Sequence, residues 1–182
     1  MNSKTINITQ SALFAALISL SAVIRIPIGP VPLTCQTISV LIAGYYLGPA
    51  YGAFATLLYT AVGLAGLPVF ASGGGPAYVL SPTFGYIIGF TFGTLITGYL
   101  ARFNPRRSIG RAYLVMLAGL PGIYIPGILW LSVALNWIGD VPLGMSVILR
   151  TGLLLPLAFD LITIVPAAFI AVRLTKTGRR TG

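Results

Sequence analysis

Two aspartates and eleven basic residues carry the ionic chemistry of this 182-residue chain, which contains no histidine. One of the aspartates, Asp160, lies between Phe159 and Leu161 in an otherwise apolar stretch. A carboxylate inside a membrane segment is costly and usually faces a cavity or a partner. We therefore expect Asp160 to accept hydrogen bonds from a ligand's N–H groups or to pair with Arg25 or Arg150. Stabilisation of a helix N-terminus, where the dipole favours a negative charge, is the structural alternative.

Residue types that support catalysis or metal binding are scarce. Cys35 is the only cysteine, so the chain cannot form an internal disulfide or a thiolate metal site. Without histidine, glutamate or a cysteine pair, little is available for metal catalysis or for acid–base chemistry near neutral pH. The Gly-x-x-x-x-Gly-Lys-Ser/Thr phosphate loop is also missing, which excludes ATP hydrolysis by that route. We predict that the protein is not an enzyme and has no metal and no cofactor.

The positions of the basic residues indicate a membrane topology. The net charge of +9 would suit a nucleic-acid-binding protein, but 57% hydrophobic and 7% charged residues cannot form a soluble basic surface. Nine basic residues lie at Lys4, within 102–111 and within 173–180. Because cytoplasmic loops carry such an excess, we predict a multi-pass plasma-membrane protein with both termini in the cytoplasm. Arg25 and Arg150 then lie outside, where each either pairs with an anion or extends to lipid headgroups.

Six apolar stretches have about the length that a membrane crossing requires, which is roughly 20 residues. They cover residues 8–26, 33–50, 51–68, 82–101, 112–136 and 157–175. An even number of crossings places both termini and the 102–111 stretch on one side, whereas five or seven would separate them. We expect one membrane domain over residues 1–182, an all-α bundle of six transmembrane helices, with almost a bare turn at Gly48-Pro49.

The loops assigned to the outer side are rich in proline and glycine. The first, 27–36, contains three prolines, which favour an extended and stiff segment. The second, 68–81, contains the triplet Gly73–Gly75, and the third, 137–156, could include a short helix along the membrane surface within 143–155. Three such loops on one face, with few charges, indicate a covered ligand site, although long connecting loops are the plainer alternative.

Small residues recur every four positions in two of the predicted helices. Gly85, Gly89 and Gly93 form one such row, and Ala12 and Ala16 form the other. Small side chains at this spacing allow helix backbones to approach closely in lipid. We interpret the glycine row as packing within the bundle. For the two alanines, a contact with another protein is also possible, because the first helix of so small a bundle is hard to bury.

Three loop motifs are distinctive. One is the run Ile28-Gly-Pro-Val-Pro-Leu-Thr-Cys-Gln-Thr37. Two others are Gly63-Leu-Ala-Gly-Leu-Pro-Val-Phe70 and Ser81-Pro-Thr-Phe-Gly-Tyr86. These motifs resemble the BioY family, whose members are the substrate-binding S components of energy-coupling factor (ECF) biotin transporters. The resemblance extends through the whole chain in order and agrees with six crossings.

The resemblance implies that biotin binds from the outside, beneath the first loop. The ureido group of biotin has two N–H donors and one carbonyl, which suit an acceptor such as Asp160 and an amide such as Gln36. Phe70 and Tyr86 would provide apolar and aromatic walls. The loop containing Gly73, Gly74 and Gly75 would cover the same site.

The resemblance also implies partners and a difference at the carboxylate end of the ligand. Ala12 and Ala16 would contact the transmembrane T component, which carries two cytoplasmic ATPases, so ATP would act only through these subunits. The family tends to have Asp-x-x-Lys near the last helix, whereas this chain has Asp160-Leu-Ile-Thr163. Thr163 departs from that pattern, which leaves Arg25 or Arg150 as the outward cation for the carboxylate.

The sequence therefore predicts a high-affinity biotin-binding S component of an ECF-type uptake transporter. One alternative is the same fold with a different small vitamin-like solute, which is motivated by Thr163. Another is a small membrane-embedded enzyme such as a lipid-modifying transferase, for which Asp160 alone provides little chemistry. A structural subunit without a ligand is a third alternative, and the elaborate outer loops argue against it.

Overall fold

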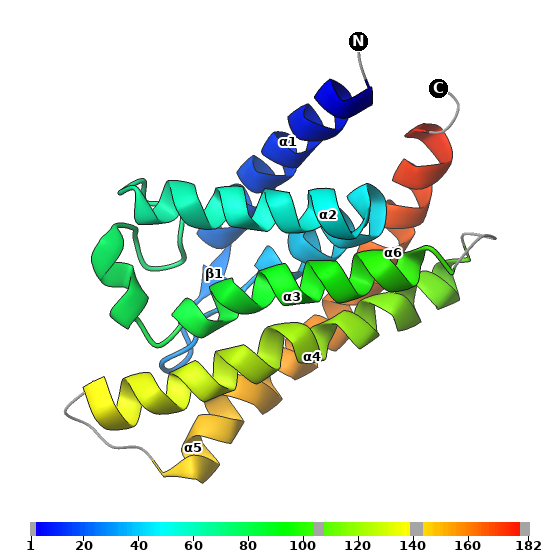
Figure 1. The fold of residues 1–182 in the computed structure, drawn as a ribbon. Coiled ribbons are helices and arrows are strands. Elements are labelled where there is room, and N and C mark those ends of the chain that lie inside the picture. Colours follow the sequence, from blue (N-terminus) through cyan, green and yellow to red (C-terminus); the bar gives the residue numbers. More distant parts are fainter. Residues whose placement is uncertain (1–2, 104–107, 139–143, 179–182) are drawn as a thin grey trace.

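The computed structural model describes residues 3–103, 108–138 and 144–178, and the fold is almost entirely helical (Figure 1). The α-helices are α1 (Ser3–Val23), α2 (Gln36–Leu64), α3 (Phe84–Ala101), α4 (Ile109–Val133), α5 (Met145–Leu149) and α6 (Leu155–Gly178). Three shorter helical segments are η1 (Pro76–Leu80), η2 (Ala134–Ile138) and η3 (Arg150–Leu154). The strands β1 (Arg25–Ile26) and β2 (Leu33–Thr34) pair antiparallel. Arg106, Arg107, Asp140, Arg179 and Arg180 lie outside the described residues.

Within the described residues, five helices are long and apolar enough to cross a membrane. They include α2, where the sequence predicts two crossings at 33–50 and 51–68. The backbone of α2 leaves the helical region at Gly48, with φ 80° and ψ 178°. A Cβ atom on Gly52 would lie 3.0 Å from the Cα of Gly44, whereas residues eight apart in a straight helix are about 12 Å apart. The chain therefore reverses direction at Gly48, and the two halves of α2 pack against each other.

The ends of the helices differ from the predicted spans by a few residues, and two of the differences change the architecture. α1 ends at Val23 rather than at residue 26, because the chain enters the β1–β2 hairpin. The predicted surface helix within 143–155 is not a separate element, since α5, η3 and α6 follow one another without a break. Pro156 has no N–H to donate within the helix, and the π-helical turn η3 directly before it accommodates this gap.

Helices α3 and α4 lie side by side (Figure 1), and the glycine row of α3 explains how closely they approach. A Cβ on Gly89 would lie 2.4 Å from the carbonyl oxygen of Ile123, and one on Gly85 would lie 2.5 Å from that of Pro126. Neither backbone could stay in place if these glycines carried side chains. The row therefore packs the bundle, as the spacing predicts.

The bundle has two distinct ends (Figure 1). The start of α1, the end of α6, the end of α3 and the start of α4 lie at one end. The loop after α2, the end of η2 and the start of α5 lie at the other end. Lys4, Arg111 and Lys176, which represent the three basic stretches, are therefore grouped at one end of the molecule.

Candidate functional site

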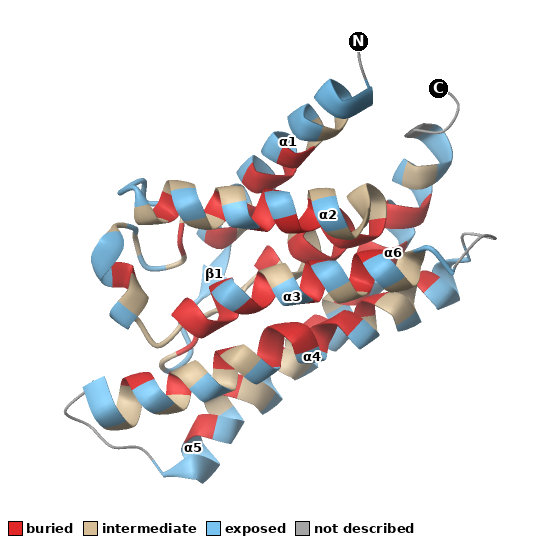
Figure 2. Ribbon diagram, in the orientation of Figure 1, coloured by how far each residue is buried: buried red, intermediate tan, exposed pale blue. Residues whose placement is uncertain are grey.

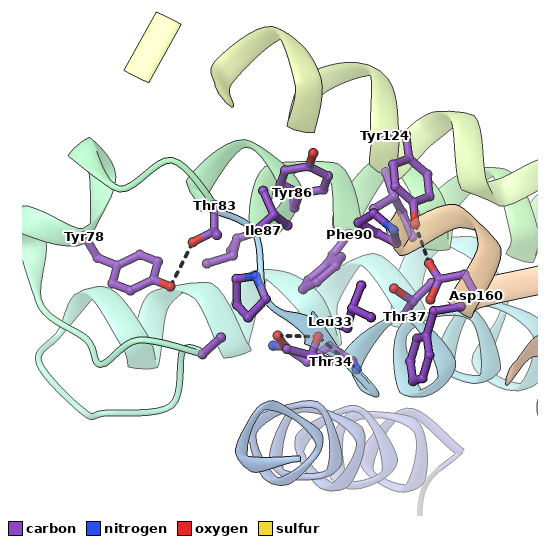
Figure 3. Close-up of a pocket in the computed structure, with 17 residues that line it drawn as sticks. Leu33, Thr34, Thr37, Tyr78, Thr83, Tyr86, Ile87, Phe90, Tyr124 and Asp160 are labelled. Carbon is purple, nitrogen blue, oxygen red and sulfur yellow. Dashed lines mark hydrogen bonds between the residues drawn. The ribbon is translucent and has the colours of Figure 1, made fainter. Parts of the chain in front are cut away.

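A cavity of about 60 Å³ lies beneath the β1–β2 hairpin, between α2, α3, α4 and α6 (Figure 3). Side chains from all four helices reach it, together with the hairpin residues 31–34. The apolar part of the lining includes Leu33, Ile87, Phe90, Ile123 and Phe159. The polar part includes Gln36, Thr37, Tyr86, Tyr124 and Asp160. A mainly apolar cavity with a few convergent polar groups is typical of a small-molecule site.

Asp160 is held inside this cavity by hydrogen bonds and is only 3% exposed. The hydroxyl of Tyr124 donates to its Oδ2 over 2.8 Å, and the side chain of Thr37 is a second partner (Figure 3). Such partners are what a buried carboxylate requires. Asp160 lies beyond the first turn of α6, which has no acidic residue, so the helix-terminus interpretation is wrong. The carboxylate keeps lone pairs with which it can accept from a ligand.

Gln36 begins α2 and provides an amide to the lining, and it is 5% exposed. Its Nε2 donates to the hydroxyl of Tyr59 over 2.6 Å, which connects the two halves of α2. The Thr34 hydroxyl donates to its Oε1 over 3.2 Å, which connects the amide to the hairpin (Figure 3). An amide nitrogen carries two N–H groups, so one remains to donate to a ligand carbonyl.

Two tyrosines on neighbouring helices form an aromatic wall beside Asp160 (Figure 3). The rings of Tyr86 and Tyr124 meet edge to face, with 6.0 Å between their centroids and 89° between their planes. The Tyr86 hydroxyl donates to the carbonyl of Gly152 over 2.7 Å, which fastens α3 to η3. Tyr86 lines the cavity, and its contact with a ligand there stays a prediction.

Phe70 does not line the cavity. Its ring stacks behind Tyr78, with 4.5 Å between centroids, and meets the edge of Tyr59 at 5.3 Å. It also covers Gly63, where a Cβ would lie 2.1 Å from the phenyl ring. Phe70 therefore supports two aromatic residues of the site region from behind, rather than forming a wall itself.

The glycine triplet also lies outside the lining and shapes the loop that does reach the cavity. Gly73 exchanges two backbone hydrogen bonds with Phe70, and the N–H of Gly75 donates to the carbonyl of Gly63 over 2.7 Å. Both glycines have positive φ, 125° and 101°, which other residues rarely adopt. A Cβ on Gly74 would lie 2.0 Å from a neighbouring carbonyl oxygen. The triplet thus positions the loop that contributes Ala71 and Tyr78 to the lining.

The two outward arginines occupy different environments. Arg25, in β1, donates a hydrogen bond to the carbonyl of Ala71, and Ala71 lines the cavity. Arg25 also borders a wider hollow of about 650 Å³ between α1 and residues 68–73. Arg150 is exposed at the start of η3 and lines neither space. The half-buried Thr163 donates to the backbone carbonyl of Asp160 over 3.3 Å and is also outside the lining.

The two alanines of α1 are exposed, in contrast to their neighbours. Ser11, Ala15 and Ile18 are buried against the bundle, whereas Ala12 and Ala16 face outward. Figure 2 shows the resulting division of α1 into a buried side and an exposed side. The spacing thus marks a surface of small side chains that the bundle leaves uncovered.

Comparison with known proteins assigns the chain to a family. The model of the BioY family matches residues 1–180. The chain belongs to the BioY family. The probable biotin transporter BioY of Lysinibacillus sphaericus is 37% identical over 96% of this chain and 89% of its own length. The biotin transporter BioY of Thermotoga maritima is 40% identical over 92% of this chain and 94% of its own.

A solved structure shows the same fold. It is the crystal structure of the S-component for biotin from an ECF-type ABC transporter, and its TM-score with this chain is 0.81. The two chains are 28% identical, and the match covers 97% of this chain and 95% of that one. The family resemblance found in the loop motifs is thereby confirmed, and the fold is that of an ECF S component.

Sequence reasoning missed the residues that orient Asp160. Tyr124 lies in a long apolar stretch, and a single tyrosine there is usually a packing residue. Thr37, which contacts Asp160, gave no signal either. Tyr59 was also missed, because it reaches Gln36 only through the reversal of α2 at Gly48. A search for hydroxyl groups that could satisfy the buried carboxylate would have selected Tyr124, since a buried charge requires such partners.

Proposed function

We propose that this chain is the biotin-binding S component of an ECF-type uptake transporter. Its membership of the BioY family and its likeness to the S-component for biotin support this function. The observation that carries the proposal is the position of the Asp160 carboxylate. It is shielded from solvent, accepts a hydrogen bond from Tyr124 and lines a small, mainly apolar cavity. An acceptor of this kind suits a neutral cyclic N–H donor such as the ureido group of biotin.

In the proposed complex the bicyclic ring of biotin lies beneath the hairpin. One ureido N–H donates to Asp160, and the ureido carbonyl accepts from the amide of Gln36. Phe90, Tyr86 and Tyr124 surround the apolar part of the ring. The cavity of about 60 Å³ has room for only a few water molecules. We expect the hairpin to move outward to admit the ring and to close again over it.

We assign the carboxylate of biotin to Arg25 rather than to Arg150. Arg25 is fastened to Ala71 at the wall of the cavity and borders the wider hollow beside it. A valeryl chain leaving the ring site past Ala71 would bring its carboxylate to this guanidinium. Thr163 occupies the position of the family's lysine but does not reach the lining.

The same proposal extends to partners and orientation. Ala12 and Ala16 form the contact with a transmembrane T component that works with two ATPase subunits. In the plasma membrane, the end with the termini and Arg111 faces the cytoplasm, because this end carries the positive charge. The two halves of α2 then provide separate crossings, which gives six in total.

Competition binding tests the ligand. Purified protein in detergent is incubated with radiolabelled biotin, together with an excess of unlabelled biotin, riboflavin or thiamine. We expect displacement by biotin alone. Displacement of the label by another vitamin at lower concentration than biotin would instead favour the alternative solute that Thr163 suggests.

A further inference from the structure

A second hollow lies toward the end of the bundle where α3 ends and α4 begins, and its lining shares no residue with the Asp160 cavity. It has a volume of about 250 Å³ and lies between the end of α3 and the start of α4. Leu100, Phe103, Leu114, Val115 and Ala118 form its apolar walls, and Arg111 is its single charged residue. Phe103 is 67% exposed and Leu114 is 63% exposed, so the hollow opens on the outside of the bundle.

Within the described part of the chain, the cation at this hollow has no carboxylate partner. The chain contains eleven basic residues and only two acidic ones. Asp160 is the acidic residue among those described, and it is buried in the other cavity. Arg102 caps the end of α3 nearby and lies 6.0 Å from the ring centre of Tyr99. Arg111 thus lines an apolar hollow without an acidic side chain, and Arg102 lies at the adjoining end of α3.

We propose that this hollow binds one anionic phospholipid of the cytoplasmic leaflet. The phosphate group would accept hydrogen bonds from Arg111, and Arg102 would add to the positive potential. The first part of an acyl chain would lie against Leu114 and Ala118. Basic hollows between membrane helices on the cytoplasmic side are suited to anionic headgroups. An anion alone would leave the apolar walls uncovered, whereas a phospholipid matches both the charge and the walls.

The site is tested by titrating purified protein with phosphatidylglycerol or phosphatidylcholine of identical chains and counting bound lipids by native mass spectrometry. This assay is done in detergent, so it does not depend on the proposed orientation or on the proposed ligand. We expect one phosphatidylglycerol to bind at least about fivefold more tightly than phosphatidylcholine, because Arg111 at the headgroup contributes roughly fivefold and Arg102 adds to this preference. Equal binding of the two lipids would overturn the proposal.

Two pairs of variants separate a shaped site from general attraction to positive charge. Ala118→Phe fills the hollow without changing any charge, and Leu129→Phe places the same ring on exposed α4 surface outside it. We expect Ala118→Phe to abolish the preference for phosphatidylglycerol and Leu129→Phe to keep it. Retention of the preference in Ala118→Phe would contradict the proposal. The unfolding midpoint of each variant, compared with that of the parent protein, reports whether the variant is folded.

Each variant of the second pair removes one positive charge at the same end of the bundle. Arg111→Gln changes the residue in the hollow, and Arg173→Gln changes an exposed arginine of α6 that lies over the ring of Phe169. We expect Arg111→Gln to weaken phosphatidylglycerol binding more than Arg173→Gln does. Equal losses would show diffuse attraction instead of a site. Unchanged lipid binding by Arg111→Gln, with weakened assembly with ATPase subunits, would assign this surface to a protein partner and overturn the proposal.

Discussion

Replacing Asp160 by asparagine keeps the shape of the side chain and removes its charge. Tyr124 already donates to Oδ2 over 2.8 Å. The substitution therefore affects mainly the hydrogen bond that a ligand N–H would donate to the other oxygen. A charge-assisted hydrogen bond is about twice as strong as a neutral one. Its loss should cost about 1.5–3 kcal/mol, which corresponds to a roughly 10- to 150-fold weaker affinity for biotin. Isothermal titration of purified Asp160→Asn and parent protein measures this difference.

Thr163→Val provides a matched control for that experiment. Thr163 is in the next turn of α6 and donates to the backbone carbonyl of Asp160, but it does not line the cavity. We expect its replacement to change biotin affinity by less than about threefold, because only a backbone contact worth roughly 0.5 kcal/mol is lost. If Asp160→Asn also changed biotin affinity by less than about threefold, with an unchanged unfolding midpoint, Asp160 would not be the acceptor for the ligand.

Three further predictions concern the carboxylate, the partner and the topology. Arg25→Ala should weaken the binding of biotin by about two- to fivefold, as for an exposed ion pair, and should leave the binding of a biotin amide unaffected. Arg150→Ala should change the binding of neither ligand. An equal loss of affinity for both ligands in Arg25→Ala would remove Arg25 from the site. Ala12→Trp or Ala16→Trp should preserve biotin binding in detergent and abolish energised uptake in cells with the T component, since close helix approach requires small side chains. Loss of biotin binding in these variants would mean that the alanines pack within the bundle. In a Cys35→Ser background, Ser72→Cys should react with a membrane-impermeant thiol reagent in intact cells and Ser108→Cys should not, and the opposite pattern would reverse the assigned orientation.

The fold was largely predictable because the few charged residues are clustered between long apolar stretches. Apolar stretches separated by Gly and Pro indicate membrane helices, and the glycine row of α3 predicts its close contact with α4. The reversal at Gly48 was also visible, since Gly-Pro interrupts a helix. The continuous run from Met145 through α6 was not predicted, because a π-helical turn before Pro156 depends on tertiary packing.

The site was only partly predictable. Asp160, Gln36 and Tyr86 were selected from residue type and motif, and the structure brings all three to one cavity. Phe70 and the glycine triplet lie behind residues that line the cavity and do not line it themselves. Sequence spacing cannot distinguish such supporting residues from residues that line the cavity. Tyr124 was missed because its importance comes from a hydrogen bond across two helices that are distant in the sequence.

The central claim is that the cavity beneath the hairpin binds biotin. Isothermal titration of the purified parent protein with biotin tests this claim most directly. We expect tight binding of one biotin per chain, with a negative change in heat capacity because apolar surface is buried. Absence of heat with biotin at every temperature tested, together with clear binding of another vitamin, would contradict the proposed function.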